Sequence, residues 1–152
     1  MVVDASLLAS MLIDVQGPIG ERYRSRFVEL VGDDRAYVLR TLTRLEVLAA
    51  LKRQLQSAEI QGRTNITAEF CDQLVREMSG WPFRRIDLTQ SMVVRIWELR
   101  ANMSPYDAMY VAATEQLHSD LDGRVLLATA DGPLSGTPGL SIPIELFVPS
   151  VG

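Results

Sequence analysis

The stretch NMSPYDAMYVAA, residues 102–113, predicts the start of a helix that carries one charged group on an otherwise apolar segment. Ser104 is a typical N-cap residue, Pro105 fits the first helical position and Asp107 is the third, which together form a capping box. One interpretation of Asp107 is therefore structural, because a carboxylate here accepts backbone hydrogen bonds and complements the positive end of the helix dipole. The other interpretation is that Asp107 takes part in chemistry.

Short apolar runs alternate with longer segments of helical period on both sides of this stretch. The alternation predicts an α/β fold, a three-layer α/β/α sandwich on a mainly parallel sheet of about five strands. No repeat or linker interrupts the pattern, so a single domain over residues 1–152 is expected. The expected strands are residues 1–4, 36–39, 83–88, 124–131 and 141–148, and the expected helices are residues 6–14, 18–32, 41–59, 65–80, 89–101 and 104–118.

The composition, 47% hydrophobic and 22% charged, is that of a globular protein. The apolar N-terminus lacks a preceding positive charge and contains Asp4, which argues against a signal peptide, and no run of about 18 apolar residues could span a membrane. We therefore expect a cytoplasmic protein. A single cysteine, Cys71, permits no internal disulfide, and a single histidine, His118, gives little support to a zinc site or a Ser-His-Asp triad.

The basic residues are grouped along a chain whose net charge is -4. This net charge argues against attraction of nucleic acid by the molecule as a whole. The groups are either solvated helix faces or a local rim that binds phosphate, and the sequence leaves both open. They are Arg22, Arg24 and Arg26; Arg40 and Arg44; Lys52 and Arg53; and Arg84 and Arg85.

Two further acids stand where strands are expected to end. Asp4 follows the apolar run MVV, and Asp131 follows VLLATA. Each has a structural alternative, because Asp4 could cap the next helix and Asp131 could form a turn with Gly132 and Pro133. In open parallel sheets, however, the working crevice lies beyond the carboxyl ends of the strands.

Glu46 is a fourth acid of interest, because it lies beside the stripe of the 41–59 helix that is expected to face the core. An acid in that place loses hydration unless a cation or a hydrogen-bond donor meets it. The structural alternative is an ion pair with Arg40 or Arg53. The stripe is expected to consist of Leu42, Leu45, Leu48, Ala49 and Leu55.

These four acids could all converge on one crevice. Carboxylates packed closely together raise one another's pKa values unless a divalent cation neutralises them, and a set of oxygen ligands suits Mg²⁺ or Mn²⁺ better than zinc. Such an ion can activate a water for attack on a phosphodiester without a histidine base. The pattern predicts metal-dependent phosphodiester hydrolysis.

Four motifs, VVDAS, LEVLAALKR, NMSPYDAMYVAATEQL and LLATAD, resemble in order and spacing those of the PIN-domain ribonucleases, and most closely those of the VapC-type toxins of bacterial type II toxin-antitoxin modules. The resemblance implies that Asp4, Glu46, Asp107 and Asp131 are catalytic and hold Mg²⁺ or Mn²⁺, with support from the hydroxyls of Ser6 and Thr129. It also implies endonucleolytic cleavage of RNA, a cognate antitoxin that covers the acidic pocket, and a homodimer or a toxin-antitoxin hetero-oligomer.

Two rival interpretations remain to be weighed. A phospho-acceptor receiver domain would need a lysine at a late strand end, whereas the sole lysine, Lys52, falls within an expected helix. The stronger rival is a catalytically inactive PIN-like binding or scaffold module whose acids serve as caps and ion pairs. Apolar helix faces are also expected around residues 45–53 and 66–78. Such faces usually mark an interface, so a partner protein is expected to cover them.

Overall fold

A computed structural model describes residues 1–13, 25, 28–29 and 36–147. The helix expected over residues 18–32 falls almost wholly outside these ranges. In the described residues, five parallel strands form one sheet in the order β3-β2-β1-β4-β5. The strands are β1 (Val2–Val3), β2 (Tyr37–Leu39), β3 (Arg84–Ile86), β4 (Leu127–Thr129) and β5 (Ile144–Leu146).

The strand order follows from where the apolar residues lie. Every residue of β1 and β4 is buried, as expected for central strands of a parallel sheet that is covered on both faces. Strand β3 lies at an edge and exposes Arg84 and Arg85. The register pairs Val2 of β1 with Tyr37 of β2 on one side and with Leu127 of β4 on the other.

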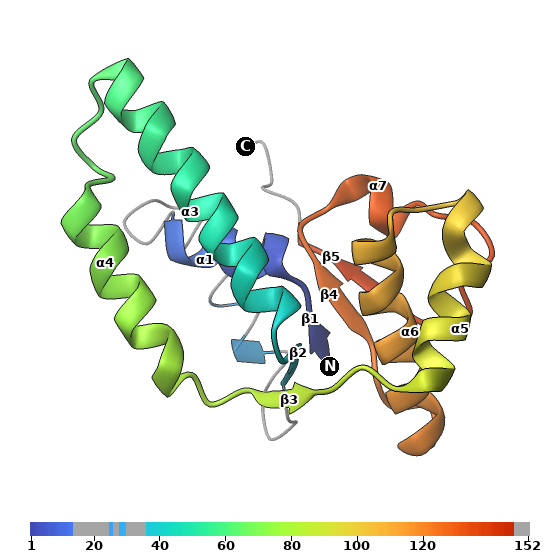
Figure 1. Ribbon diagram of the computed structural model, residues 1–152. Coiled ribbons are helices and arrows are strands. Elements are labelled where there is room, and N and C mark those ends of the chain that lie inside the picture. The colour runs from blue at the N-terminus through green and yellow to red at the C-terminus, as the bar shows by residue number, and fades with distance from the viewer. Residues whose placement is uncertain (14–24, 26–27, 30–35, 148–152) are drawn as a thin grey trace.

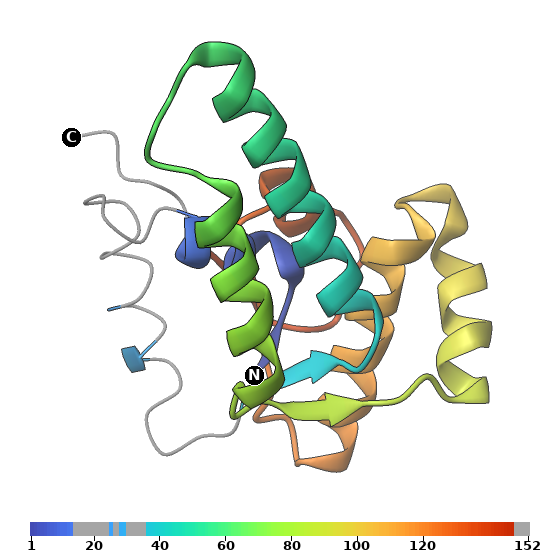
Figure 2. The ribbon, with the colours of Figure 1, turned by 60° about the vertical axis from the view of Figure 1, so that its left-hand side comes forward.

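Helices cover both faces of the sheet and complete the predicted three-layer α/β/α arrangement (Figure 1). Helices α1, α3 and α4 lie on one side, and α5 and α6 lie on the other. Figure 2 shows α3 and α4 side by side as a hairpin that projects beyond the strands. The helices are α1 (Ala5–Ile13), α3 (Leu42–Gln61), α4 (Ala68–Glu77), α5 (Gln90–Glu98), α6 (Pro105–Asp120) and the short α7 (Gly132–Ser135), with single 3-10 turns η1 (Met78–Gly80) and η2 (Leu99–Ala101).

The helix starts agree with the capping residues in the sequence. The Ser104 side chain accepts a hydrogen bond from the Asp107 N–H at the start of α6, and Thr89 accepts one from the Met92 N–H at the start of α5. The predicted caps of these two helices are therefore confirmed. None of the helices in the described ranges is long and apolar enough to cross a membrane.

The predicted inner stripe of α3 is wrong at Leu45, Leu48 and Ala49, whereas Leu42 and Leu55 are partly buried against the core as predicted. The buried positions of this helix are Thr43, Val47, Leu51 and Ala58, whereas Leu45 is 58% exposed and Leu48 is also exposed. Leucine and alanine occur around most of the helix, so their spacing does not single out the face that packs against the core.

Candidate active site

All four predicted acids line one pocket of about 150 Å³. The sheet order reverses between β1 and β4, and the pocket lies just beyond the carboxyl ends of these two strands, the usual place for a site in an open parallel sheet. Asp4 follows β1 and Asp131 follows β4, while α3 and α6 contribute the other two acids. The residues that line the pocket are Asp4, Ala5, Ser6, Ala9, Glu46, Ala50, Arg53, Asp107, Tyr110 and Asp131.

Asp4 is the most deeply buried of these acids, with 4% of its surface exposed. Its Oδ1 accepts hydrogen bonds from Ser6 Oγ (2.6 Å) and the Leu7 N–H (3.0 Å), and its Oδ2 accepts one from Thr129 Oγ1. Burial raises the pKa of Asp4 above its usual value, and the nearby charge of Asp131 adds to this rise, although the three donors oppose it.

The end of strand β4 orients the two hydroxyls that serve Asp4. The Ala130 N–H donates to Ser6 Oγ at 3.0 Å, and the Asp131 N–H donates to Thr129 Oγ1 at 2.9 Å. Because the backbone N–H groups occupy acceptor positions on these hydroxyls, each hydroxyl proton is free to point at the carboxylate. The structure thus places Ser6 and Thr129 against Asp4, where the sequence expected supporting hydroxyls.

Glu46 is half-buried and accepts a 2.7 Å hydrogen bond from the Tyr110 hydroxyl. Burial raises the pKa of Glu46, and the charges of Asp4 and Asp107 raise it further, while the Tyr110 hydrogen bond and the positive charge of Arg53 act in the opposite direction. The charges of Asp4 and Asp107 therefore act on Glu46 across the pocket.

An ion pair between Glu46 and Arg40 was one structural alternative, and it is wrong. Arg40 instead pairs with Asp87 in an exposed contact at the ends of β2 and β3. Arg53, the other cation considered, does line the acidic pocket, although its side chain is largely exposed.

Tyr110 is a pocket residue that the sequence reasoning missed. It is buried, and its hydroxyl lies 3.0 Å from Thr43 Oγ1, which accepts a hydrogen bond from the Leu39 N–H. Burial raises the pKa of Tyr110 well above its usual value, so this hydroxyl remains a proton donor. Tyr110 lies three residues after Asp107, on the same face of α6, and this spacing could have predicted it as a pocket residue.

Asp107 and Asp131 each take part in a helix cap, and each also lines the pocket. Ser104 Oγ accepts from the Asp107 N–H at 3.2 Å and donates to Asp107 Oδ2 at 2.7 Å. Asp131 Oδ1 accepts from the Leu134 N–H at 3.2 Å, which makes Asp131 the N-cap of α7 rather than part of a simple turn. Capping and lining the pocket are therefore compatible for both acids.

The carboxylate oxygens that line the pocket are suitable ligands for a hard divalent cation. The charges of neighbouring acids contribute to the raised pKa values of Asp4 and Glu46. Within the described part of the chain, no three Asp, Glu, His or Cys side chains come close enough to form a complete metal-binding group by themselves. Mg²⁺ is compatible with this spacing, because it commonly keeps several waters and takes one or two carboxylates.

The parallel sheet with an acidic pocket at the β1–β4 junction defines a PIN-like α/β fold. The chain is 34% identical to the VapC ribonuclease Mb0985 of Mycobacterium bovis and to ribonuclease VapC9 of Mycobacterium tuberculosis. Each match covers 96% of this chain and 97% of the relative. No family model matches the chain. The chain belongs to the VapC ribonuclease family, which confirms the resemblance drawn from its motifs.

Proposed function

We propose that the protein is a Mg²⁺-dependent endoribonuclease and the toxin of a type II toxin-antitoxin module. The observation that carries this proposal is one pocket lined by four carboxylates from distant parts of a chain of the VapC ribonuclease family. The names of the relatives support RNA as the substrate. Hydrolysis of a phosphodiester by an activated water accounts for the charge and composition of the pocket.

In this proposal Asp4 and Asp107 are the principal metal ligands, with Glu46 and Asp131 as further oxygen ligands, direct or through water. When bound, Mg²⁺ or Mn²⁺ polarises a water and offsets the negative charge that develops on the phosphate. Asp4 remains oriented because Ser6, Leu7 and Thr129 all donate to it.

Arg53 is proposed to bind a phosphate of the RNA. It lies on the exposed edge of the acidic pocket, and it is the cation among the described residues that line this pocket. A guanidinium can donate two parallel hydrogen bonds to phosphate oxygens. This arrangement would hold the RNA backbone beside carboxylates that otherwise repel it.

A cognate antitoxin and a second copy of the chain are the proposed protein partners, in the cytoplasm. Helix α3 exposes Leu45 and Leu48, and α4 exposes Val75. Exposed apolar side chains on neighbouring helices support a covering partner. An antitoxin that places a basic side chain in the acidic pocket would also complement its charge.

RNA cleavage by the purified protein tests the proposal. Cleavage is expected in Mg²⁺ or Mn²⁺ and is expected to be lost in excess EDTA. It is also expected to be lost in the Asp4→Asn and Asp107→Asn variants, whose folding is verified by circular dichroism. Asp120→Asn, at the exposed end of α6, is the matched control and should cleave normally. Cleavage that persists in EDTA would contradict the metal mechanism, and a folded protein that binds RNA or an antitoxin without cutting would favour the inactive module.

A further inference from the structure

A second pocket, of about 270 Å³, opens on the other side of the start of α6. Its walls are mainly apolar, and they come from α5, η2, Met103 and the first residue of α6. The acidic pocket uses none of these side chains. The lining residues are Val93, Ile96, Trp97, Arg100, Met103 and Pro105.

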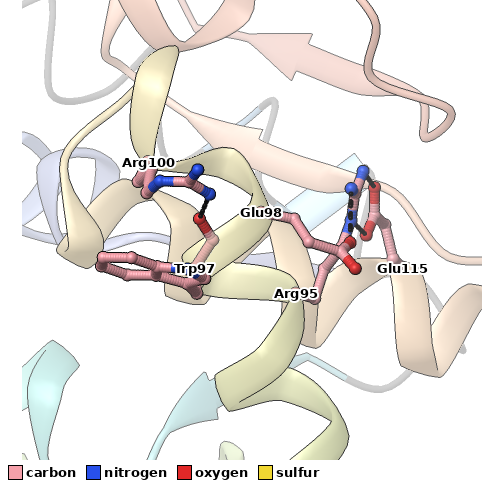
Figure 3. Close-up of polar contacts among 5 residues, drawn as sticks. All are labelled: Arg95, Trp97, Glu98, Arg100 and Glu115. Carbon is pink, nitrogen blue, oxygen red and sulfur yellow. Dashed lines mark hydrogen bonds and ion pairs between the residues drawn. The ribbon is translucent and has the colours of Figure 1, made fainter.

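Trp97 and Arg100 form a stacked pair in this pocket (Figure 3). The Arg100 guanidinium carbon lies 4.6 Å from the centroid of the indole ring, and Arg100 Nη1 donates a 2.9 Å hydrogen bond to the Trp97 carbonyl. Trp97 is nevertheless 68% exposed. Among the described residues, the remaining N–H groups of Arg100 meet no acceptor, so a planar aromatic ring and hydrogen-bond donors face outward together.

An ion pair holds this part of α5 against α6. Arg95 donates to the carboxylate of Glu115 through Nε at 2.7 Å and Nη2 at 2.9 Å, and it also donates to Glu98 at 3.2 Å (Figure 3). Because the Glu115 contact is bidentate, it fixes orientation as well as distance. Trp97 therefore stands on a helix that is anchored to the helix of Asp107, and Arg100 lies in the 3-10 turn that follows it.

The first turn of α6 links the two pockets. Pro105 lines the apolar pocket and Asp107 lines the acidic pocket on the other side of the helix. Because the two residues are only two positions apart, their Cα atoms lie within about 7.6 Å of each other. Tyr106, between them, is 61% exposed. Trp97 and Tyr106 are the aromatic side chains among the large exposed hydrophobics of the described residues. Tyr106 lies in this turn, and Trp97 lines the same pocket as Pro105.

We propose that the apolar pocket binds an unpaired nucleobase of the RNA, next to the phosphodiester cleaved in the acidic pocket. This inference rests on the proposed ribonuclease function. Single-stranded RNA is recognised by splayed bases that stack on aromatic rings and arginine planes, and Trp97 with Arg100 offers both surfaces. The positive charge of Arg100, which lines the pocket beside Trp97, complements the RNA backbone.

The test measures binding of a short single-stranded RNA of mixed sequence in an Asp107→Asn background, which removes the proposed cleavage. Adding Trp81→Phe leaves Trp97 as the sole tryptophan, so its fluorescence reports on the apolar pocket. RNA is expected to quench this fluorescence, and an RNA with abasic positions is expected to quench it less. Trp97→Ala should weaken RNA binding about tenfold, and Trp97→Phe should keep most of the affinity.

Arg100→Gln should also weaken binding, whereas Arg76→Gln, an exposed arginine on α4, is the matched control and should not. Unchanged RNA affinity in Trp97→Ala would overturn the proposal, and so would loss of self-association or of antitoxin binding without a change in RNA affinity. The outcome is separable from the proposed function, because cleavage by the unmodified protein is measured independently. If that protein binds RNA through Trp97 but never cuts it, the nuclease proposal fails and the base site stands.

Discussion

The Tyr110 hydroxyl donates a 2.7 Å hydrogen bond to Glu46 Oε2, and this contact joins α6 to α3 at the acidic pocket. Both residues line that pocket together with Asp107, which lies one turn earlier on α6. The spacing between two of the proposed metal-binding acids therefore depends on a tyrosine that is not itself a proposed ligand. Such a partner orients a ligand and tunes its charge.

Tyr110→Phe tests this dependence. Loss of the hydroxyl removes a donor that lowers the pKa of Glu46, so that pKa should rise further. The acid limb of the cleavage profile should then move to higher pH, and the free energy of unfolding should fall by about 1–2 kcal/mol. pH-rate profiles and urea unfolding provide the measurements, with the exposed Tyr106→Phe as control. An unchanged acid limb would show that the hydroxyl has no part in setting the charge of Glu46.

The stability of the protein should respond to pH and Mg²⁺ in a linked way. The pKa values of Asp4 and Glu46 are raised in the folded state, so the metal-free folded state binds protons more tightly than the unfolded chain. These two groups therefore favour folding below their unfolded pKa values, and this contribution is lost as pH rises through the folded values. Added Mg²⁺ should raise the Tm most above that window and least below it, because protons compete with the metal. Thermal melts over a pH series measure this, and a Mg²⁺ effect independent of pH would contradict the linkage.

Thr129→Val should destabilise the protein despite the similar shape of the two side chains. The fully buried hydroxyl donates to Asp4 and accepts from the Asp131 N–H, and valine leaves both groups without that partner. A loss of about 1–3 kcal/mol is expected in urea unfolding. Thr129→Ser keeps the hydroxyl and should retain more of the stability. Equal losses in the two variants would assign the effect to packing instead.

Arg53→Gln should weaken RNA binding while leaving the fold intact. Because the charge of Arg53 lowers the pKa of Glu46, the acid limb of the cleavage profile should also move to higher pH. The expected change is mainly a higher KM, since the residue is proposed to hold a phosphate. The neighbouring exposed Lys52→Gln, which does not line the pocket, is the matched control. A similar rise in KM for both variants would mean that only the general charge of α3 matters.

The strands and most helices could be predicted from sequence because their signals are local. Short β-like runs predicted the five strands, and Thr89 and Ser104 predicted two helix starts. Which side of α3 packs against the core could not be predicted from local sequence. Leucines lie around much of that helix, and only the packing of the fold selects Val47 and Leu51 as buried positions. The short α7 was missed because Asp131, Gly132 and Pro133 are also typical of a turn.

The acids of the site could be predicted, but their partners could not. Asp4 and Asp131 stood at expected strand ends, and the sheet order then brought them to one crevice. Tyr110 looked like one more apolar position of α6, since nothing in the sequence shows that its hydroxyl reaches Glu46. Arg40 was one of the two arginines considered as an ion-pair partner of Glu46, yet parallel pairing of β2 and β3 places it beside Asp87.

Mg²⁺ binding by isothermal titration calorimetry tests most directly whether Asp4 and Asp107 serve one cation. The unmodified protein and Asp120→Asn should bind the ion with the same affinity. Asp4→Asn and Asp107→Asn, each folded by circular dichroism, should each lose more than the roughly tenfold in affinity that removal of even a supporting partner causes. If both variants remain folded and bind Mg²⁺ as tightly as the unmodified protein, the two carboxylates do not hold the metal and the account is contradicted.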